Sequence, residues 1–180
     1  MTAPVPAGIR LRPARGDDAA AIYAVHARAV RGTGSHYTFD EREAWAGGRT
    51  PEDYLAAISG RHVVVAESAD SPPRVLGFGQ LLPSEGLVEA VYVDPDAERR
   101  GIGAALFAAL EREARARGAR TLALEASLNS VPFYRAQGFD VDVAAKHPLA
   151  PGVTLRCMVM SKALDAPAMP PMPEPPCPPR

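Results

Sequence analysis

The most informative segment of the chain reads Val91-Tyr92-Val93-Asp94-Pro95-Asp96-Ala97-Glu98-Arg99-Arg100-Gly101-Ile102-Gly103-Ala104-Ala105-Leu106. Its pattern predicts an apolar strand, a loop with two glycines and an Ala- and Leu-rich helix. A helix start has unpaired N–H groups and the positive end of the helix dipole, and glycines let a bulky anion approach the backbone. The segment therefore indicates a diphosphate-binding loop, although a tight turn chosen for packing explains the glycines alone equally well.

The composition is that of one small domain. The chain has 180 residues, of which 47% are hydrophobic, enough to fill a single core. Twenty basic and twenty-one acidic residues leave a net charge of -1, which favours neither nucleic acid nor a membrane surface as partner. The N-terminus lacks signal-peptide features and no apolar run approaches the roughly 20 residues of a membrane span, so a cytoplasmic location is expected. The two cysteines, Cys157 and Cys177, form neither a disulfide framework nor a metal-ligand set, and no metal is expected.

Periodicity and turn residues predict an α/β fold with a mixed sheet flanked by helices on both faces. The expected strands are 8–12, 62–67, 75–82, 86–93, 121–125, 139–143 and 154–161. The expected helices are 17–30 with Asp17 as its cap, 51–59 after Thr50, 103–117 before Gly118, and 132–137, with one helical turn near 42–46 in a loop. The domain is expected to span 8–163, between a flexible N-terminus at 1–7 and a proline-rich, disordered tail at 164–180.

Three segments resemble the GNAT N-acetyltransferase superfamily. The opening segment is similar to its acetyl-CoA-binding motif, and Ala126-Ser127-Leu128-Asn129-Ser130-Val131-Pro132-Phe133-Tyr134-Arg135-Ala136-Gln137-Gly138-Phe139 resembles its fourth helix. A softer match is Ile9-Arg10-Leu11-Arg12-Pro13-Ala14 followed by Asp17-Asp18. The resemblance covers roughly residues 8–163. It implies the GNAT-type (acyl-CoA N-acyltransferase) fold and acetyl-CoA as co-substrate, without a metal.

The resemblance also implies how acetyl-CoA binds. The diphosphate is expected on the loop and first helical turn, and the pantetheine arm on the backbone of the preceding strand. The residues concerned are Arg99, Arg100, Gly101, Ile102, Gly103 and Ala104 for the diphosphate, and Val91, Tyr92 and Val93 for the pantetheine. The superfamily asparagine that contacts pantetheine has no direct counterpart, so its role falls to Ser127, to Asn129 or to neither. Glu98 departs from the motif, which usually has Gln or Arg there.

Two residues are predicted to move protons. Tyr134 stands where the superfamily often has its acidic tyrosine, and a phenol with a pKa of about 10 can protonate the leaving thiolate. Glu89 stands where related enzymes often hold a catalytic carboxylate; strand alternation places it on one face with Val91 and Val93. Aromatic packing for Tyr134 and a solvated side chain for Glu89 are the competing interpretations. Glu125 is the competing carboxylate, and repulsion across one cleft would raise one of the two pKa values.

The acceptor site is expected between the first helices. Tyr37 and Trp45 provide aromatic surface and His36 a titratable imidazole, with Glu125 also facing the acceptor. A histidine in a loop is also often merely exposed, and His26, inside a helix, is more often structural.

The predicted function is acetyl-CoA-dependent N-acetylation. The acetyl group is expected to move to a primary amine of a small molecule or peptide by direct attack in a ternary complex. The alternative is a non-catalytic acyl-CoA-binding module of the same fold, for which Glu98 and Ser127 leave room; Glu89 and Tyr134 favour the enzyme. A dinucleotide-binding module fits less well, because the full Gly-x-Gly-x-x-Gly series is missing. Dimers are common in the superfamily, so a homodimer is compatible with the resemblance.

Overall fold

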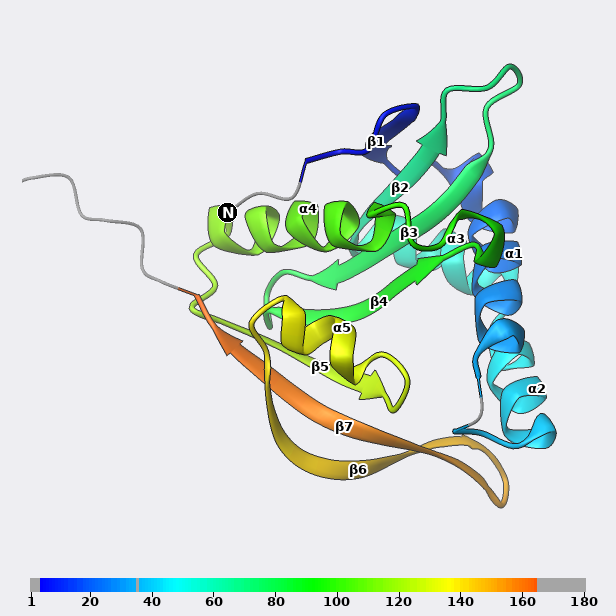
Figure 1. The fold of residues 1–180 in the computed structure, drawn as a ribbon, viewed down its shortest axis with the longest axis vertical. Helices are drawn as coiled ribbons and strands as arrows, with labels where there is room; N and C mark the ends of the chain where they lie inside the picture. Colours follow the sequence, from blue (N-terminus) through cyan, green and yellow to red (C-terminus); the bar gives the residue numbers. More distant parts are fainter. Residues whose placement is uncertain (1–3, 35, 165–180) are drawn as a thin grey trace, which may run out of the picture.

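The computed structural model describes residues 4–34 and 36–164, and Figure 1 shows its elements. The helices are α1 (Ala19–Gly32), α2 (Phe39–Gly47), α3 (Pro51–Gly60), α4 (Ile102–Ala116) and α5 (Val131–Ala136), with single 3-10 turns at Gly16–Asp18 and Pro95–Ala97. The strands are β1 (Ile9–Pro13), β2 (His62–Ser68), β3 (Val75–Leu82), β4 (Leu87–Val93), β5 (Thr121–Ser127), β6 (Asp140–Ala150) and β7 (Val153–Ala163).

Within the described residues, the strands form one mixed sheet in the order β1-β2-β3-β4-β5-β7-β6. β4 and β5 are parallel and joined through α4, whereas the other neighbouring strands are antiparallel. The predicted α/β fold with a mixed sheet is therefore confirmed.

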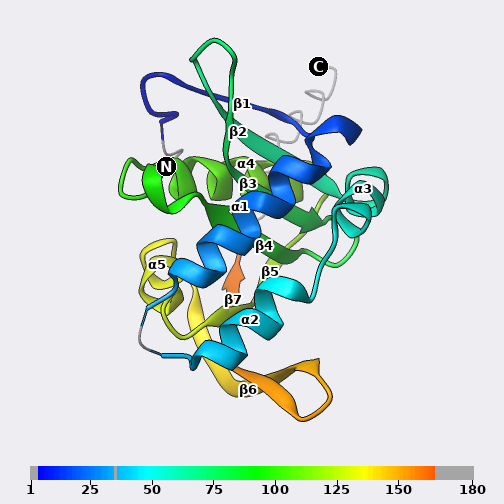
Figure 2. The same ribbon diagram turned by 90° about the vertical axis from the view of Figure 1, so that its right-hand side faces the viewer.

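Helices cover both faces of the sheet. Leu106 and Leu110 of α4 are fully buried in a core that also includes Tyr134 of α5. On the opposite face, Ile22 of α1 and Tyr54 of α3 pack in a second core around Phe78 of β3. In Figure 2, α4 and α5 lie to the left of the sheet and α3 to the right. Helices thus cover the central strands on both faces, whereas β6 is largely exposed.

β4 and β5 separate soon after they meet. Their pairing is Leu87 with Ala123, supported by a hydrogen bond from Ala123 N to the carbonyl of Gly86 at 3.0 Å. Figure 1 shows the two strands diverging toward their carboxyl ends. A parallel pair that splits leaves backbone groups of β4 without a neighbouring strand, which is the position that an extended ligand can occupy.

The helical part of 33–48 is longer than predicted. Instead of one turn, α2 has nine residues and begins with a capping box, in which Thr38 Oγ1 accepts from Glu41 N and Glu41 Oε2 accepts from Thr38 N. The Thr-x-x-Glu spacing was the sequence signal for this helix. It places Trp45 on an ordered element rather than in a loop.

Two further boundaries differ. Asp18, not Asp17, precedes α1, and its carboxylate is bound by the side chain of Arg12 and by Arg15 N. The last two strands are each eleven residues long and are joined by a tight turn at 151–152. They extend beyond the predicted strands 139–143 and 154–161 toward each other.

The ends of the chain are only partly described. Leu164 follows β7, is 5% exposed and donates its N–H to the carbonyl of Arg120. Residues 1–3 of the predicted N-terminal segment and residues 165–180 of the predicted tail lie outside the described residues. Of the helices that the structure describes, none combines the length and the apolar character needed to cross a membrane.

Candidate active site

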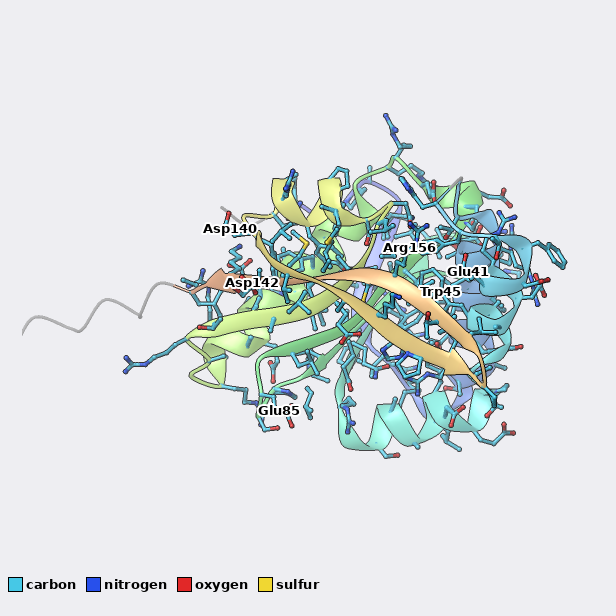
Figure 3. All side chains as sticks on the ribbon, turned by 90° about the horizontal axis from the view of Figure 1, so that it is seen from below. Glu41, Trp45, Glu85, Asp140, Asp142 and Arg156 are labelled. Atoms are coloured by element: carbon cyan, nitrogen blue, oxygen red, sulfur yellow. The ribbon has the colours of Figure 1, made fainter. Side chains whose placement is uncertain are left out.

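A cavity of about 710 Å³ lies along β4, where β4 and β5 diverge. All seven residues of β4 line it; α1, α2 and α3 form one wall, and β5, α5 and the β6–β7 hairpin form the other. Figure 3 shows from below the region where α2 approaches this hairpin, with Trp45 of α2 and Arg156 of β7 labelled. The cavity extends from Glu98, just before α4, to the carboxylates of Glu89 and Glu125.

The loop before α4 presents backbone N–H groups. Side-chain hydroxyls of Thr38 and Thr50 cap α2 and α3, but the residue that caps α4 is Gly101, which has no side chain to accept these hydrogen bonds. Gly101 has a φ of +81°, in the left-handed region that favours glycine. The N–H groups of the first turn of α4 are therefore not used by a capping side chain, and they suit an anion.

The side chains around this loop point in different directions. Arg99 and Arg100 are exposed, and neither lines the cavity. Ile102 is 1% exposed and packs in the α4 core, so its side chain does not face a ligand. Glu98, the departure from the superfamily motif, is exposed and does line the cavity.

A β-bulge displaces Glu89 from its predicted face. The register between β3 and β4 shifts after Gln80, which makes Glu89 the extra residue of β4. The Oε2 atom of Glu89 accepts hydrogen bonds from Gln80 Nε2 at 2.9 Å and from Arg61 Nε at 2.8 Å, whereas Val91 and Val93 pack against the α4 core. The predicted alternation, with Glu89, Val91 and Val93 on one face, is wrong because the bulge resets it.

Tyr134 lines the cavity, and its ring packs against three phenylalanine rings. Its side chain is held edge-on against Phe107, Phe133 and Phe139, with ring centroids 6.4, 5.0 and 5.7 Å away. Burial, and to a smaller extent the nearby Tyr92, raise the pKa of Tyr134 above its ordinary value. The Tyr134 hydroxyl makes no hydrogen bond within the described ranges.

The two candidates for pantetheine contact both line the cavity. The hydroxyl of Ser127 lies 2.8 Å from that of Ser130, and Asn129 lies between them in the turn that leads into α5. The placement fits both residues, and their roles stay a prediction.

The predicted acceptor residues divide into two groups. Trp45 and Glu125 line the cavity, but His36 and Tyr37 do not. The Tyr37 hydroxyl donates to the carbonyl of Arg156 and accepts from Leu128 N, both at 2.7 Å. It thereby ties the segment before α2 to the ends of β5 and β7.

The His36 side chain is exposed, and its carbonyl accepts a hydrogen bond from Arg156 Nη2 at 2.9 Å. The part taken by His36 and Tyr37 in acceptor binding therefore stays a prediction, without support from the shape of the cavity.

Several titratable residues that line the cavity were not singled out as site residues from the sequence, among them Arg49, Asp53, His147 and Cys157. The Nδ1 atom of His147 lies 2.9 Å from Oε2 of Glu125. Burial raises the pKa of the Cys157 thiol. The sequence carried no local signal for His147, because its segment lies beyond the predicted strands and only the long hairpin brings it to β5. In the part of the chain that the structure describes, no group of three or more His, Cys, Asp or Glu side chains is arranged to hold a metal.

Comparison with known proteins agrees with this architecture. The model of the acetyltransferase (GNAT) family matches residues 19–139. A GCN5-related N-acetyltransferase structure from Rhodopseudomonas palustris is 29% identical, with 89% of this chain and 99% of that chain covered and a TM-score of 0.81. A ribosomal-protein-alanine N-acetyltransferase from Brucella melitensis is 26% identical, with coverage of 86% and 99% and a TM-score of 0.59.

A third structure shares the fold. It is a putative acetyltransferase from Salmonella typhimurium with its cofactor acetyl-CoA, 24% identical over 92% of this chain and 99% of that chain, with a TM-score of 0.66. No curated protein sequence matches the chain significantly. Because the family model covers more than half of the chain, and the fold and cavity agree with it, the protein belongs to the GNAT family of acetyltransferases.

Proposed function

We propose that the protein moves an acetyl group from acetyl-CoA to a primary amine of a small molecule or peptide, by direct attack in a ternary complex. One observation carries the proposal: a single cavity connects the region before the uncapped start of α4 with a buried tyrosine and two carboxylates. Membership of the GNAT family and the acetyl-CoA-bound Salmonella structure support acetyl-CoA as the donor.

The chain's own residues fit the donor. When bound, acetyl-CoA supplies an acyl group activated as a thioester. The N–H groups of Ile102, Gly103 and Ala104 bind its diphosphate, because no side chain caps this turn. Arg99 and Arg100 add positive charge nearby, and the backbone of β4 at 91–93 pairs with the pantetheine arm where β5 has moved away.

Tyr134 supplies the proton for the departing thiolate. Its raised pKa keeps the phenol protonated across the neutral range, so it acts as a donor and not as a base. The surrounding phenyl rings exclude water and hold the hydroxyl toward the cavity.

Glu89 takes the proton from the amine. An alkylammonium has a pKa near 10.4 and must lose a proton before it can attack. Both hydrogen bonds to Glu89 reach Oε2, which leaves Oε1 available to a substrate amine or to a bridging water. Trp45 and Glu125 contact the acceptor, Trp45 through its ring and Glu125 from the opposite wall.

The decisive test measures thiol release from acetyl-CoA across amines, polyamines, aminoglycosides, amino acids and short peptides, with mass confirmation of each product. An acetylated amine is the expected result. Tight acetyl-CoA binding without any product would contradict the proposal and favour the binding module instead.

The choice of base is tested with a matched pair of variants, Glu89→Gln and Glu125→Gln. We expect Glu89→Gln to lower kcat/KM on the order of 100-fold, because a general base contributes about that much. Glu125→Gln should change KM for the acceptor more than kcat. The reverse result would assign the base to Glu125.

A further inference from the structure

Arg49 is an exposed, positively charged residue at the edge of the cavity. It lies between Gly48, which ends α2, and Thr50, which caps α3, so two helix ends hold its backbone. Among the described residues that line the cavity, Arg49 is the sole lysine or arginine. It makes no hydrogen bond or ion pair within the described ranges.

The carboxylates in the same part of the cavity already have partners. Glu89 is paired with Arg61 at 2.8 Å, and Glu125 with His147 at 2.9 Å. Asp53 Oδ2 accepts from the backbone N–H of Thr50 at 2.8 Å. The remaining lining carboxylate, Glu98, belongs to the loop before α4 at the carboxyl end of β4. Three of these carboxylates therefore have protein partners, whereas the exposed guanidinium of Arg49 has none among the described residues and is open to a ligand.

A second polar group beside Arg49 is also unsatisfied. His26 of α1 is 2% exposed, lines the same cavity, and its Nδ1 is buried without a hydrogen-bond partner. Its ring packs edge-on against Tyr92 at 4.8 Å and Tyr54 at 6.0 Å. Burial, and then the charge of Arg49, lower the pKa of His26 to about 4, so the imidazole is neutral at neutral pH.

A guanidinium beside a neutral imidazole suits a carboxylate. The planar guanidinium binds a carboxylate through two parallel hydrogen bonds, and a neutral imidazole has one N–H to donate. Glu89 of β4 and Glu125 of β5 line the same cavity. Both hydrogen bonds to Glu89 reach Oε2, so its Oε1 can accept from an ammonium group. The cavity thus has a positive end and a negative side, and it complements a molecule that carries both charges.

We propose that Arg49, assisted by His26, binds a carboxylate of the acceptor, so that the preferred acceptors are amino acids or other zwitterionic amines. This inference rests on the proposed N-acetyltransferase function and names its substrate class.

The test compares each amino acid with its amide, for example β-alanine with β-alaninamide, which keeps the amine and removes the negative charge. In the unaltered protein we expect KM for the acid to be about 10- to 100-fold below that for the amide, the value of one charged hydrogen-bonding pair. Arg49→Gln should raise KM for the acid by the same factor and leave the amide within about twofold. Arg112→Gln, an exposed arginine of α4 outside the cavity, is the matched control.

Binding decides the inference independently of turnover. Calorimetry would measure the affinity of the same acids and amides for the complex of the protein with CoA. Acid-selective binding that Arg49→Gln abolishes supports the inference even where no product forms, in which case only the proposed function fails. Equal affinity for acid and amide, or an equal loss of both in Arg49→Gln, overturns it. An unchanged melting temperature in Arg49→Gln excludes loss of fold as the cause.

Discussion

At the scale of single residues, the cavity depends on buried groups that keep a defined protonation state. Tyr134 packs against phenyl rings, and its phenol stays protonated. His26 packs against tyrosine rings, and its imidazole stays neutral. In both cases burial is the main cause, because it disfavours the charged form of either group.

Tyr134→Phe should lower kcat on the order of 100-fold, because it removes the proton donor for the thiolate. The affinity for acetyl-CoA should stay close to that of the unaltered protein, since the ring and its contacts remain. Steady-state thiol release and calorimetry separate the two quantities. Tyr54→Phe, at a buried tyrosine that lines the same cavity, serves as control. Full turnover in Tyr134→Phe would exclude the tyrosine as the acid.

Because of His26, the free energy of unfolding should decrease in mild acid. The pKa of His26 is about 4 in the folded protein and near 6.5 when unfolded. In the window between these values the unfolded chain binds a proton that the folded chain does not, so the free energy of unfolding falls as pH decreases. Between pH 7.5 and pH 5 the loss from this residue is about 2 kcal/mol.

Urea denaturation at the two pH values checks this. His26→Phe should remove about 2 kcal/mol of the pH dependence, and His36→Phe, at an exposed histidine, should leave it in place. The same pH dependence in both variants would mean that His26 is protonated in the folded protein.

At the scale of secondary structure, one strand and one helix end create the binding surface. The bulge in β4 turns Glu89 toward Arg61 and Gln80, and the split between β4 and β5 opens the space beside it. Helix α4 starts at a glycine and therefore leaves its first N–H groups to a ligand.

The two ends of α4 provide a matched test of this role. Gly101 before the helix and Gly118 after it both have a φ of +81°. Gly101→Val and Gly118→Val should each lower the free energy of unfolding by about 1–2 kcal/mol, the cost of a left-handed conformation for a branched residue. Only Gly101→Val should weaken acetyl-CoA binding, measured by calorimetry, by about tenfold. An unaltered affinity would place the diphosphate elsewhere.

At the scale of the whole molecule, the cavity needs both halves of the sheet. One wall comes from α1, α2 and α3, near the start of the chain, and the other from β5, α5 and the β6–β7 hairpin. The segment before α2 is tied to the far half through Tyr37, which bonds Leu128 and Arg156. The described residues through Leu164 therefore contain both walls and both cores.

Shortening the chain tests this boundary. A protein that ends at Leu164 should keep its stability and turnover. One that ends at Ala163 loses a buried leucine side chain and its backbone hydrogen bond to Arg120, and should be less stable by about 2–5 kcal/mol. Thermal and urea denaturation of the two proteins measures the difference. Loss of stability in the protein that ends at Leu164 would show that residues 165–180 contribute to the fold.

Most helices and strands and the family resemblance could be predicted from the sequence, whereas the full length of α2 and of the last two strands could not. Local signals are enough for the former: the apolar alternation of the strands, the Thr50 cap, and the glycines on either side of α4 each act over a few residues. The residues along β4 and Tyr134 were found in the same way, through motifs that are continuous in sequence, although their roles stay predictions.

Which side chains from distant parts of the chain line the same cavity could not be predicted from the sequence and became visible in the tertiary structure. The bulge at Glu89 arises from pairing with β3, which no pattern within β4 records. His147 reaches Glu125 because the last hairpin is long, and Arg49 and His26 line one cavity because α1, α2 and α3 pack together. Such contacts join residues far apart in the chain, and their geometry is set by packing of whole elements rather than by local sequence.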